Sequence, residues 1–442
     1  MKKRKGGEAV KEKTKVTKNG IKIHSYRNST LHSFTLSLYL KAGCIYEREG
    51  EGGITHFLEH TLYRNVNTLM EGKLYSTLDR LGLEFGASTY NEMVQFTLSG
   101  VPSKFTDAVD ILCKLFSPLV LPRAEFLAEL GRVKAEIRES DDRTSLSAFT
   151  SSCVHGTTAL SRPILGTLGE ISRISQRKLE AYRKEVFSQG NLFVYVTGNV
   201  GEGELEYLSK ALDTVRLSDA PLRTNAAPVS QNFGKREPKV HIKNADFTMV
   251  RFTFDMDMSR LPFGVDDLLY EILLGGNNSR FYIELSEKRG LFYDISGSVE
   301  KYKNIGSFFF NYEIRAGSVY DALELSLSLL LDLCRGELTE QECMKVGYTE
   351  GGLLLYDDPR ELGYTFAYDC HILDAPYGSI EERSALYSAI TPEQIVRAAR
   401  EIFRPENLTL TMKANKKKTD SARLEGLLRD YAVRYREICG KG

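Results

Sequence analysis

The sequence predicts an α+β protein of two homologous domains, each a mostly antiparallel sheet covered by helices. Its 442 residues exceed what one hydrophobic core usually serves, so two domains of roughly 200 residues each are expected. Segments with the period-2 apolar pattern of strands alternate with segments of helical period. The order of these segments starts again in the second half, which indicates an internal duplication of one α+β unit.

The first half opens with strands on either side of a turn at Asn19-Gly20. Amphipathic helices follow, and the longest of them carries many charges on its outer face. The expected elements are strands over 14–26, 33–42, 89–101 and 191–198, and helices over 53–62, 74–81, 105–116 and 123–140.

A linker separates the halves. Residues 216–238 are rich in Pro, Ala, Ser and Asn and have no period, which is typical of an exposed connection. In the second half we expect strands over 250–256 and 306–314 and helices over 265–274 and 319–333. The predicted boundaries are a basic tail over 1–13, an N-terminal domain over 14–215, the linker over 216–238 and a C-terminal domain over 239–442.

The charge balance excludes several classes of partner. Lys+Arg and Asp+Glu both number 59, so no global field is available to bind nucleic acid or an anionic membrane. No apolar stretch approaches the roughly 20 residues that span a bilayer, and charged residues follow Met1-Lys2-Lys3-Arg4-Lys5 where a secretory signal would have an apolar run. Seven cysteines without a C-x-x-C pair suit reduced thiols, so a cytoplasmic location is expected.

The segment His56-Phe57-Leu58-Glu59-His60 is the main candidate for chemistry. On a helix the two imidazoles, four residues apart, lie one above the other on the same face, as a single zinc ion requires. Glu59 lies near that face and is placed to accept a proton from a metal-activated water. The arrangement is the H-x-x-E-H order of the inverzincins.

A catalytic zinc site needs a third protein ligand and an open position. The long helix offers Glu129 and Glu136, which are seven residues apart and share a face. One would bind the metal while the other orients a ligand histidine, and the pattern alone does not decide between them. A zinc-stabilised interaction module would prefer four protein ligands, often with cysteine, and the metal helix contains no cysteine.

Other candidate groups point to structural roles. Cys370 next to His371 resembles a thiol and base pair, but adjacent residues of a helix or strand point in different directions. Lone histidines are more often structural or solvated than metal ligands. The histidines placed in this group are His24, His32, His241 and His371.

These motifs resemble the pitrilysin family of zinc peptidases, which includes insulin-degrading enzyme and mitochondrial processing peptidase. The similarity covers residues from about 14 to 413. The segments that carry it are His56 to His60 after Gly52-Gly53, Arg162-Pro163-Ile164-Leu165-Gly166, residues 191–198, Gly275-Gly276-Asn277-Asn278-Ser279-Arg280, and Glu287-Lys288-Arg289-Gly290-Leu291-Phe292-Tyr293.

The resemblance implies a zinc peptidase in which His56, His60 and Glu136 bind Zn²⁺. As in the family, about 75 residues separate the second histidine from the ligand glutamate, so Glu129 becomes the supporting carboxylate. Glu59 would be the general base for hydrolysis by a metal-activated water. Substrates would be peptides that add as a strand to a sheet edge.

The sequence departs from the family in two places. The substrate-binding arginine expected seven residues before Tyr293 is Ser286, so half of the clamp is missing. In the strand preceding Thr89, the segment Phe85-Gly86-Ala87 stands where an Asn-Ala pair is common, so the substrate-facing edge near the zinc is expected to be locally altered.

The resemblance also implies an assembly. A family chamber needs four homologous domains and this chain has two, so a second chain is expected, with a heterodimer slightly favoured over a homodimer. The alternatives are a subunit that is inactive alone and a non-catalytic structural subunit of the same fold.

Overall fold

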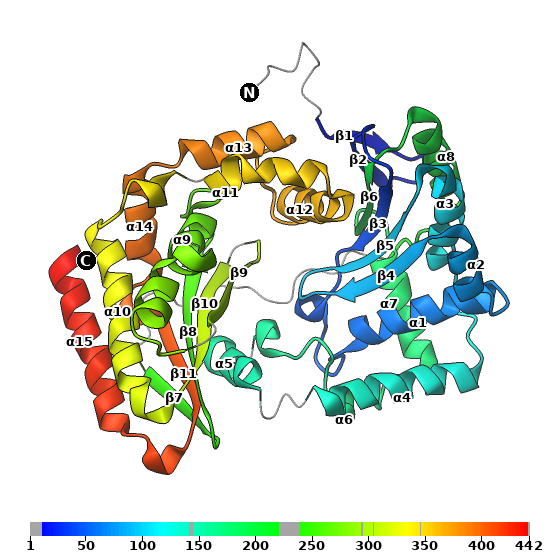
Figure 1. Ribbon diagram of the computed structural model, residues 1–442. Helices are drawn as coiled ribbons and strands as arrows, with labels where there is room; N and C mark the ends of the chain where they lie inside the picture. Colours follow the sequence, from blue (N-terminus) through cyan, green and yellow to red (C-terminus); the bar gives the residue numbers. More distant parts are fainter. Residues whose placement is uncertain are drawn as a thin grey trace, which may run out of the picture. The chain divides into compact units, whose positions relative to one another are not determined.

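The computed structural model describes residues 11–140, 145–156, 158–220, 239–292, 295–303, 305–344 and 346–440. The chain divides into two compact units (Figure 1). Unit 1 comprises the residues before 142 together with 158–228 and 353–382. Unit 2 comprises 142–157, 229–352 and the residues after 382.

Unit 1 is built on a six-stranded sheet in the order β1-β2-β6-β3-β5-β4. Neighbouring strands are antiparallel except for the parallel pair β2 and β6. The turn between the first two strands passes through Gly20 at φ 83°, where glycine has no steric penalty. The strands are β1 (Lys13–Val16), β2 (Lys22–Arg27), β3 (Phe34–Leu40), β4 (Glu84–Thr89), β5 (Val94–Gly100) and β6 (Leu192–Gly198).

The two faces of this sheet differ in chemistry. Alternate residues of β3, such as Leu36 and Leu38, join a core with the helices of the first half. The intervening residues, such as Ser37 and Tyr39, face the other side, where Tyr39 donates to the carbonyl of Gly363. The helices of unit 1 are α1 (Ile54–Leu69), α2 (Leu74–Leu81), α3 (Phe105–Cys113), α4 (Arg123–Glu139), α6 (Leu168–Ile171), α7 (Gln176–Val186), α8 (Glu202–Asp213) and α12 (Pro359–His371).

Unit 2 repeats the plan with five strands in the order β7-β11-β8-β10-β9. Its strands are β7 (Lys239–Asn244), β8 (Thr248–Asp257), β9 (Ile295–Lys301), β10 (Ile305–Ile314) and β11 (Leu408–Ala414). The helices of the second half outside α12 are α9 (Val265–Leu274), α10 (Val319–Arg335), α11 (Val346–Thr349), α13 (Ile380–Ala389), α14 (Pro392–Ile402) and α15 (Ser421–Cys439), and α5 (Leu146–His155) packs on β11 and β8.

The strand orders confirm the α+β class and the repeated unit. The series β2-β6-β3-β5-β4 and β7-β11-β8-β10-β9 match position by position. In each series the first pair is parallel and the other three pairs are antiparallel. Unit 1 has one further strand, β1, which has no counterpart in the five-stranded sheet of unit 2. The eight elements expected in the first half are present, and the strand expected before Thr89 is β4, which ends at that residue. Helix α1 continues to Leu69 rather than ending near residue 62.

The compact units differ from the contiguous domains 14–215 and 239–442. Helix α12 comes from the second half of the sequence and packs on β3 and β6 of unit 1, whereas α5 comes from the first half and packs in unit 2. Residues 221–238 of the expected linker and residues 1–10 of the expected tail lie outside the described residues. Residues 11 and 12 are described, and β1 already begins at Lys13. No helix in the described ranges is both long and apolar enough to cross a membrane.

Candidate metal centre

A buried carboxylate fixes the start of α1. Gly53, at the N-cap, has φ 79° and offers no side chain to cap the helix. Glu47 is fully buried and accepts hydrogen bonds from the backbone N–H groups of Gly53 and Thr55, both at 3.0 Å. Burial raises the pKa of Glu47 to about 7, although these hydrogen bonds favour its charged form. The helix therefore begins at a defined residue, Ile54, two residues before its first histidine.

Helices α1 and α4 pack together and bring three predicted ligands to one point. Nε2 of His56 lies 3.7 Å from Oε2 of Glu136, and Nε2 of His60 lies 3.5 Å from the same oxygen. One ligand atom from each residue lies within 4.8 Å of the others. Because His56 and His60 are one helical turn apart, the helix itself sets the spacing of the two imidazoles.

Glu129 lies behind His60. Its Oε2 is 3.8 Å from Nδ1 of His60, on the ring edge opposite the nitrogen that faces Glu136. Arg132 donates to the other oxygen at 2.9 Å. Burial opposes ionisation of Glu129, but His60 and Arg132 outweigh it and lower the pKa of this carboxyl. A carboxylate in this position is suited to orienting the imidazole of His60.

Glu59 lies beside the ligands and is held from β4. The hydroxyl of Thr89, the last residue of β4, donates to Oε2 of Glu59 at 2.5 Å. Burial raises the pKa of Glu59, although this hydrogen bond and the charge of His60 oppose the change.

The donor set fits zinc. Burial and the nearby His60 lower the pKa of His56 to about 4, so its imidazole is neutral at pH 7, which is the ligand form. Among the described residues no group hydrogen-bonds to the buried Nδ1 of His56. Burial also disfavours the charged form of His60, but Glu129, Glu59 and Glu136 outweigh it and raise its pKa. Two imidazoles and one carboxylate are a known ligand set for catalytic zinc.

A cavity of about 320 Å³ opens beside these groups. Glu59 and His60 line it on one side, and Phe85, Gly86 and Ala87 of β4 line it on the other. Strand β4 is the edge of its sheet and, in the described part of the chain, pairs only with β5. An extended chain therefore has a free row of backbone hydrogen-bonding groups next to the candidate metal centre.

The expected substrate clamp is only partly described. Tyr293 lies outside the described residues. Ser286 lies in a π-helix over Tyr282–Glu287, and its hydroxyl donates to the carbonyl of Phe292 at 3.3 Å.

Two further polar groups were not foreseen as members of a site. Glu47 and Thr89 support the metal helix from a loop and a strand, and neither belongs to a periodic pattern that would indicate such a role. Glu12 joins the rings of His24 and His371, whose centroids are 3.6 Å apart at 23°. Such stacked rings cannot direct both in-plane lone pairs at one ion, so this trio suits a structural hydrogen-bond cluster.

Comparisons with known proteins match both halves of the chain to domains of one peptidase family. Residues 22–168 match the profile of insulinase (peptidase family M16), and residues 173–346 match that of the peptidase M16 inactive domain. An uncharacterized zinc protease of Streptomyces coelicolor is 22% identical over 87% of this chain and 85% of its own length. The mitochondrial-processing peptidase subunit beta of Rattus norvegicus is 29% identical over 45% of this chain and 41% of its own.

Solved structures show the same fold. A protease from Helicobacter pylori has a TM-score of 0.81 at 18% identity and covers 92% of this chain and 100% of its own. The first half of the periplasmic protease PqqL from Escherichia coli has a TM-score of 0.76 at 16% identity and covers 96% and 97%. The fold is that of a two-domain half of an M16-type peptidase. The chain belongs to the insulinase family of zinc peptidases, M16.

Proposed function

We propose that this chain is a zinc metalloendopeptidase that hydrolyses peptides at the centre formed by His56, His60 and Glu136. The observation that carries the proposal is the convergence of these three side chains, with Glu59 beside them, at an edge strand. The family membership and the zinc protease relatives support it.

The residues around the proposed metal centre have different roles in the reaction. An extended peptide would pair with β4, whose backbone groups carry much of the affinity and little sequence selectivity. Zinc bound by the three ligands would polarise the scissile carbonyl and acidify the attacking water. Glu59 would accept the proton of that water and return it to the leaving amine, with Thr89 holding its other oxygen. Glu129 would keep the His60 ring in position.

Two comparisons of variants test the proposal. The wild type is expected to bind one zinc ion, and the His56→Ala/His60→Ala protein should lose it, as measured by metal analysis. Glu59→Gln should keep zinc but lose at least about a hundredfold in cleavage of an internally quenched peptide. Glu139→Gln, an exposed carboxylate of the same α4, is the matched control and should match the wild type. Stoichiometric zinc in the double variant, or normal turnover by zinc-loaded Glu59→Gln, contradicts the assignment.

The assembly is a further part of the proposal. We propose that a second chain of the same fold completes the enzyme, and that this chain alone is weakly active or inactive. Two observations support it: Ser286 is engaged with Phe292, and one relative is named as a subunit of a processing peptidase. Light scattering of the purified chain, combined with the peptide assay, tests it. High activity of a homodimer would refute the heterodimer.

The compartment is proposed on the state of the thiols. In the described part of the chain the seven cysteines form no disulfide with one another, which supports the proposal of a reducing, cytoplasmic setting. Measuring the thiol oxidation state in cell extracts would test this.

A further inference from the structure

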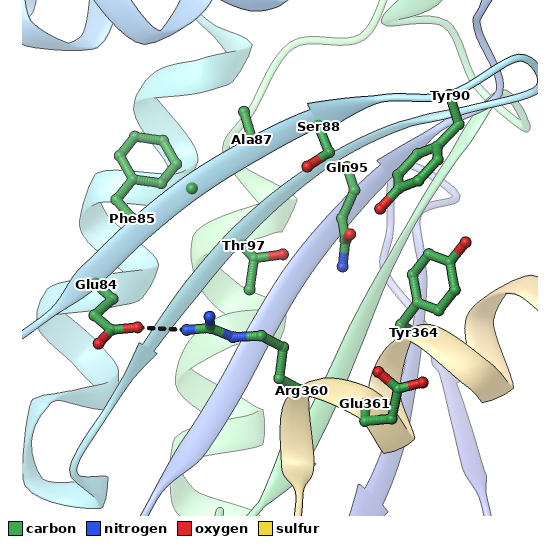
Figure 2. A pocket seen from close by; sticks show the side chains of 11 residues that line it. Glu84, Phe85, Ala87, Ser88, Tyr90, Gln95, Thr97, Arg360, Glu361 and Tyr364 are labelled. Carbon is green, nitrogen blue, oxygen red and sulfur yellow. Dashed lines mark hydrogen bonds and ion pairs between the residues drawn. The ribbon is translucent and has the colours of Figure 1, made fainter. Parts of the chain in front are cut away.

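A second cavity lies on the opposite face of β4 from α1. Its volume is about 480 Å³, and it is lined by β4, β5 and the start of α12 (Figure 2). Ser88, Gln95 and Thr97 point toward Arg360 and Tyr364 of α12. Phe85, Gly86 and Ala87 line both this cavity and the one at the candidate metal centre. The edge strand therefore separates two cavities at the same three residues.

Of the two carboxylates that line this cavity, one is ion-paired and, in the part of the chain that is described, the other is not. Arg360 forms an ion pair with Glu84 at 2.5 Å and donates to Ser99 at 3.4 Å. Glu361, the next residue of α12, also lines the cavity. Within the described residues its carboxylate has no ion-pair partner. With one guanidinium and two carboxylates in the lining, the uncompensated charge is negative and belongs to Glu361.

Aromatic rings stand beside that carboxylate. Tyr90 and Tyr364 line the cavity with ring centroids 5.7 Å apart, and Tyr364 stacks on Tyr368 at 5.9 Å. In Figure 2 the two lining rings lie near each other, tilted by 45°, above Glu361. Phenol faces carry a negative quadrupole that attracts cations, so rings and carboxylate favour the same kind of guest. A neutral aliphatic side chain would gain less here, because the floor of Ser88, Gln95 and Thr97 is polar.

The alternation of a strand connects this cavity to a peptide on β4. Successive side chains of an added strand point to opposite faces of the sheet. A peptide that presents one residue to the cavity beside His60 must present its neighbours to the cavity beside Glu361. Gly86 leaves room for this, because a Cβ built there meets no atom within 4 Å.

We propose that the cavity of Glu361, Tyr90 and Tyr364 is a subsite that binds a lysine or arginine side chain of the peptide substrate. The inference rests on the proposed peptide function and adds a preference that the metal centre cannot supply. The Glu361 carboxylate pairs with the cation, the two rings contact its stem, and Arg360 remains paired with Glu84.

Binding measurements separate this subsite from catalysis. The probe is a fluorescent decapeptide of neutral residues in which one lysine is moved along the chain, compared with norleucine at the same place. The fluorescence anisotropy of the peptide is measured with the Glu59→Gln protein, so that binding is observed without cleavage. Lysine should bind roughly three- to tenfold more tightly than norleucine at one position and not at its two neighbours. The preference should decrease with salt.

Variants at Glu361 test whether the lysine preference depends on its carboxylate. In Glu59→Gln/Glu361→Gln the ratio of lysine to norleucine affinity should fall toward one, and in Glu59→Gln/Glu361→Lys it should invert toward a glutamate peptide. Glu49→Gln, an exposed carboxylate of the same unit, is the matched control and should leave the ratio unchanged. A lysine preference that survives Glu361→Gln, a preference without positional dependence, or no binding of either peptide would overturn the proposal. If the wild type cleaves no peptide but the preference follows Glu361, the subsite stands and the enzyme assignment fails.

Discussion

Replacing Glu47 with alanine is expected to destabilise the protein by about 2 to 4 kcal/mol. Its carboxylate accepts the backbone N–H groups of Gly53 and Thr55 in a site with no exposed surface. Each buried donor left without a partner costs about 1–3 kcal/mol, and the cavity left by the side chain adds to the loss. The damage falls on the first turn of α1, so zinc affinity should fall as well.

The pH dependence of stability gives a separate signature. The pKa of Glu47 in the folded protein is about 7, above its ordinary value of 4.5, so the folded state binds this proton more tightly. The stability that the group contributes is therefore fully present below pH 4.5 and is lost as the pH rises through 7. The difference corresponds to about 3 kcal/mol, and Glu47→Gln should remove that part of the slope.

Denaturant unfolding at pH 5, 6, 7 and 8 measures both effects. Glu49→Ala is the control, because this neighbouring side chain is exposed and should change the free energy of unfolding by less than about 0.5 kcal/mol. The reasoning is refuted if Glu47→Ala matches this control, or if Glu47→Gln keeps the wild-type slope between pH 5 and 8.

Three further predictions concern the capping box of α14, the N-cap glycine of α1 and the carboxylate of Glu12. Thr391→Ala removes the capping box of α14 and should lower the free energy of unfolding by about 1 kcal/mol in a denaturant titration. Gly53→Ala should cost more than about 2 kcal/mol in the same measurement and lower zinc content, because φ is 79° and a Cβ would lie 2.3 Å from the carbonyl oxygen of Leu165. Burial opposes ionisation of Glu12, but hydrogen bonds from two histidines outweigh it and lower its pKa to about 2. The stability that Glu12 contributes is present above pH 4.5 and is lost as the pH falls through 2, so acid titration of Glu12→Gln should lack this loss.

Much of the fold followed from local patterns in the sequence. Strands such as 33–42 and 191–198 and helices such as 265–274 carry regular periods, because one face of each packs on a core. Periodicity alone does not indicate strand β4, because Glu84–Thr89 mixes Gly, Ala and Ser on an edge that has little to bury. A strand before Thr89 is expected only from the family resemblance.

The sequence predicts those parts of the site whose residues lie at a fixed spacing on one helix. His56 and His60 share one helix, so their proximity is readable from the sequence, whereas the choice between Glu129 and Glu136 needed a family resemblance. The support from Glu47 and Thr89 and the cavity beside Glu361 depend on contacts between distant segments. The placement of α12 in unit 1 depends on its contacts with β3 and β6 in the same way.

The interleaving of the two units constrains how the protein can be made and divided. Segment 353–382 supplies unit 1 with a helix that leaves the ribosome only after four of the five strands of unit 2. At ordinary elongation rates, roughly 10 to 30 s pass between the synthesis of residue 220 and that of residue 382. During this time the sheet face of Ser37 and Tyr39 lacks the helix that later covers it. A fragment that stops near residue 220 would keep that face uncovered, so the ancestral duplicates no longer behave as separable modules.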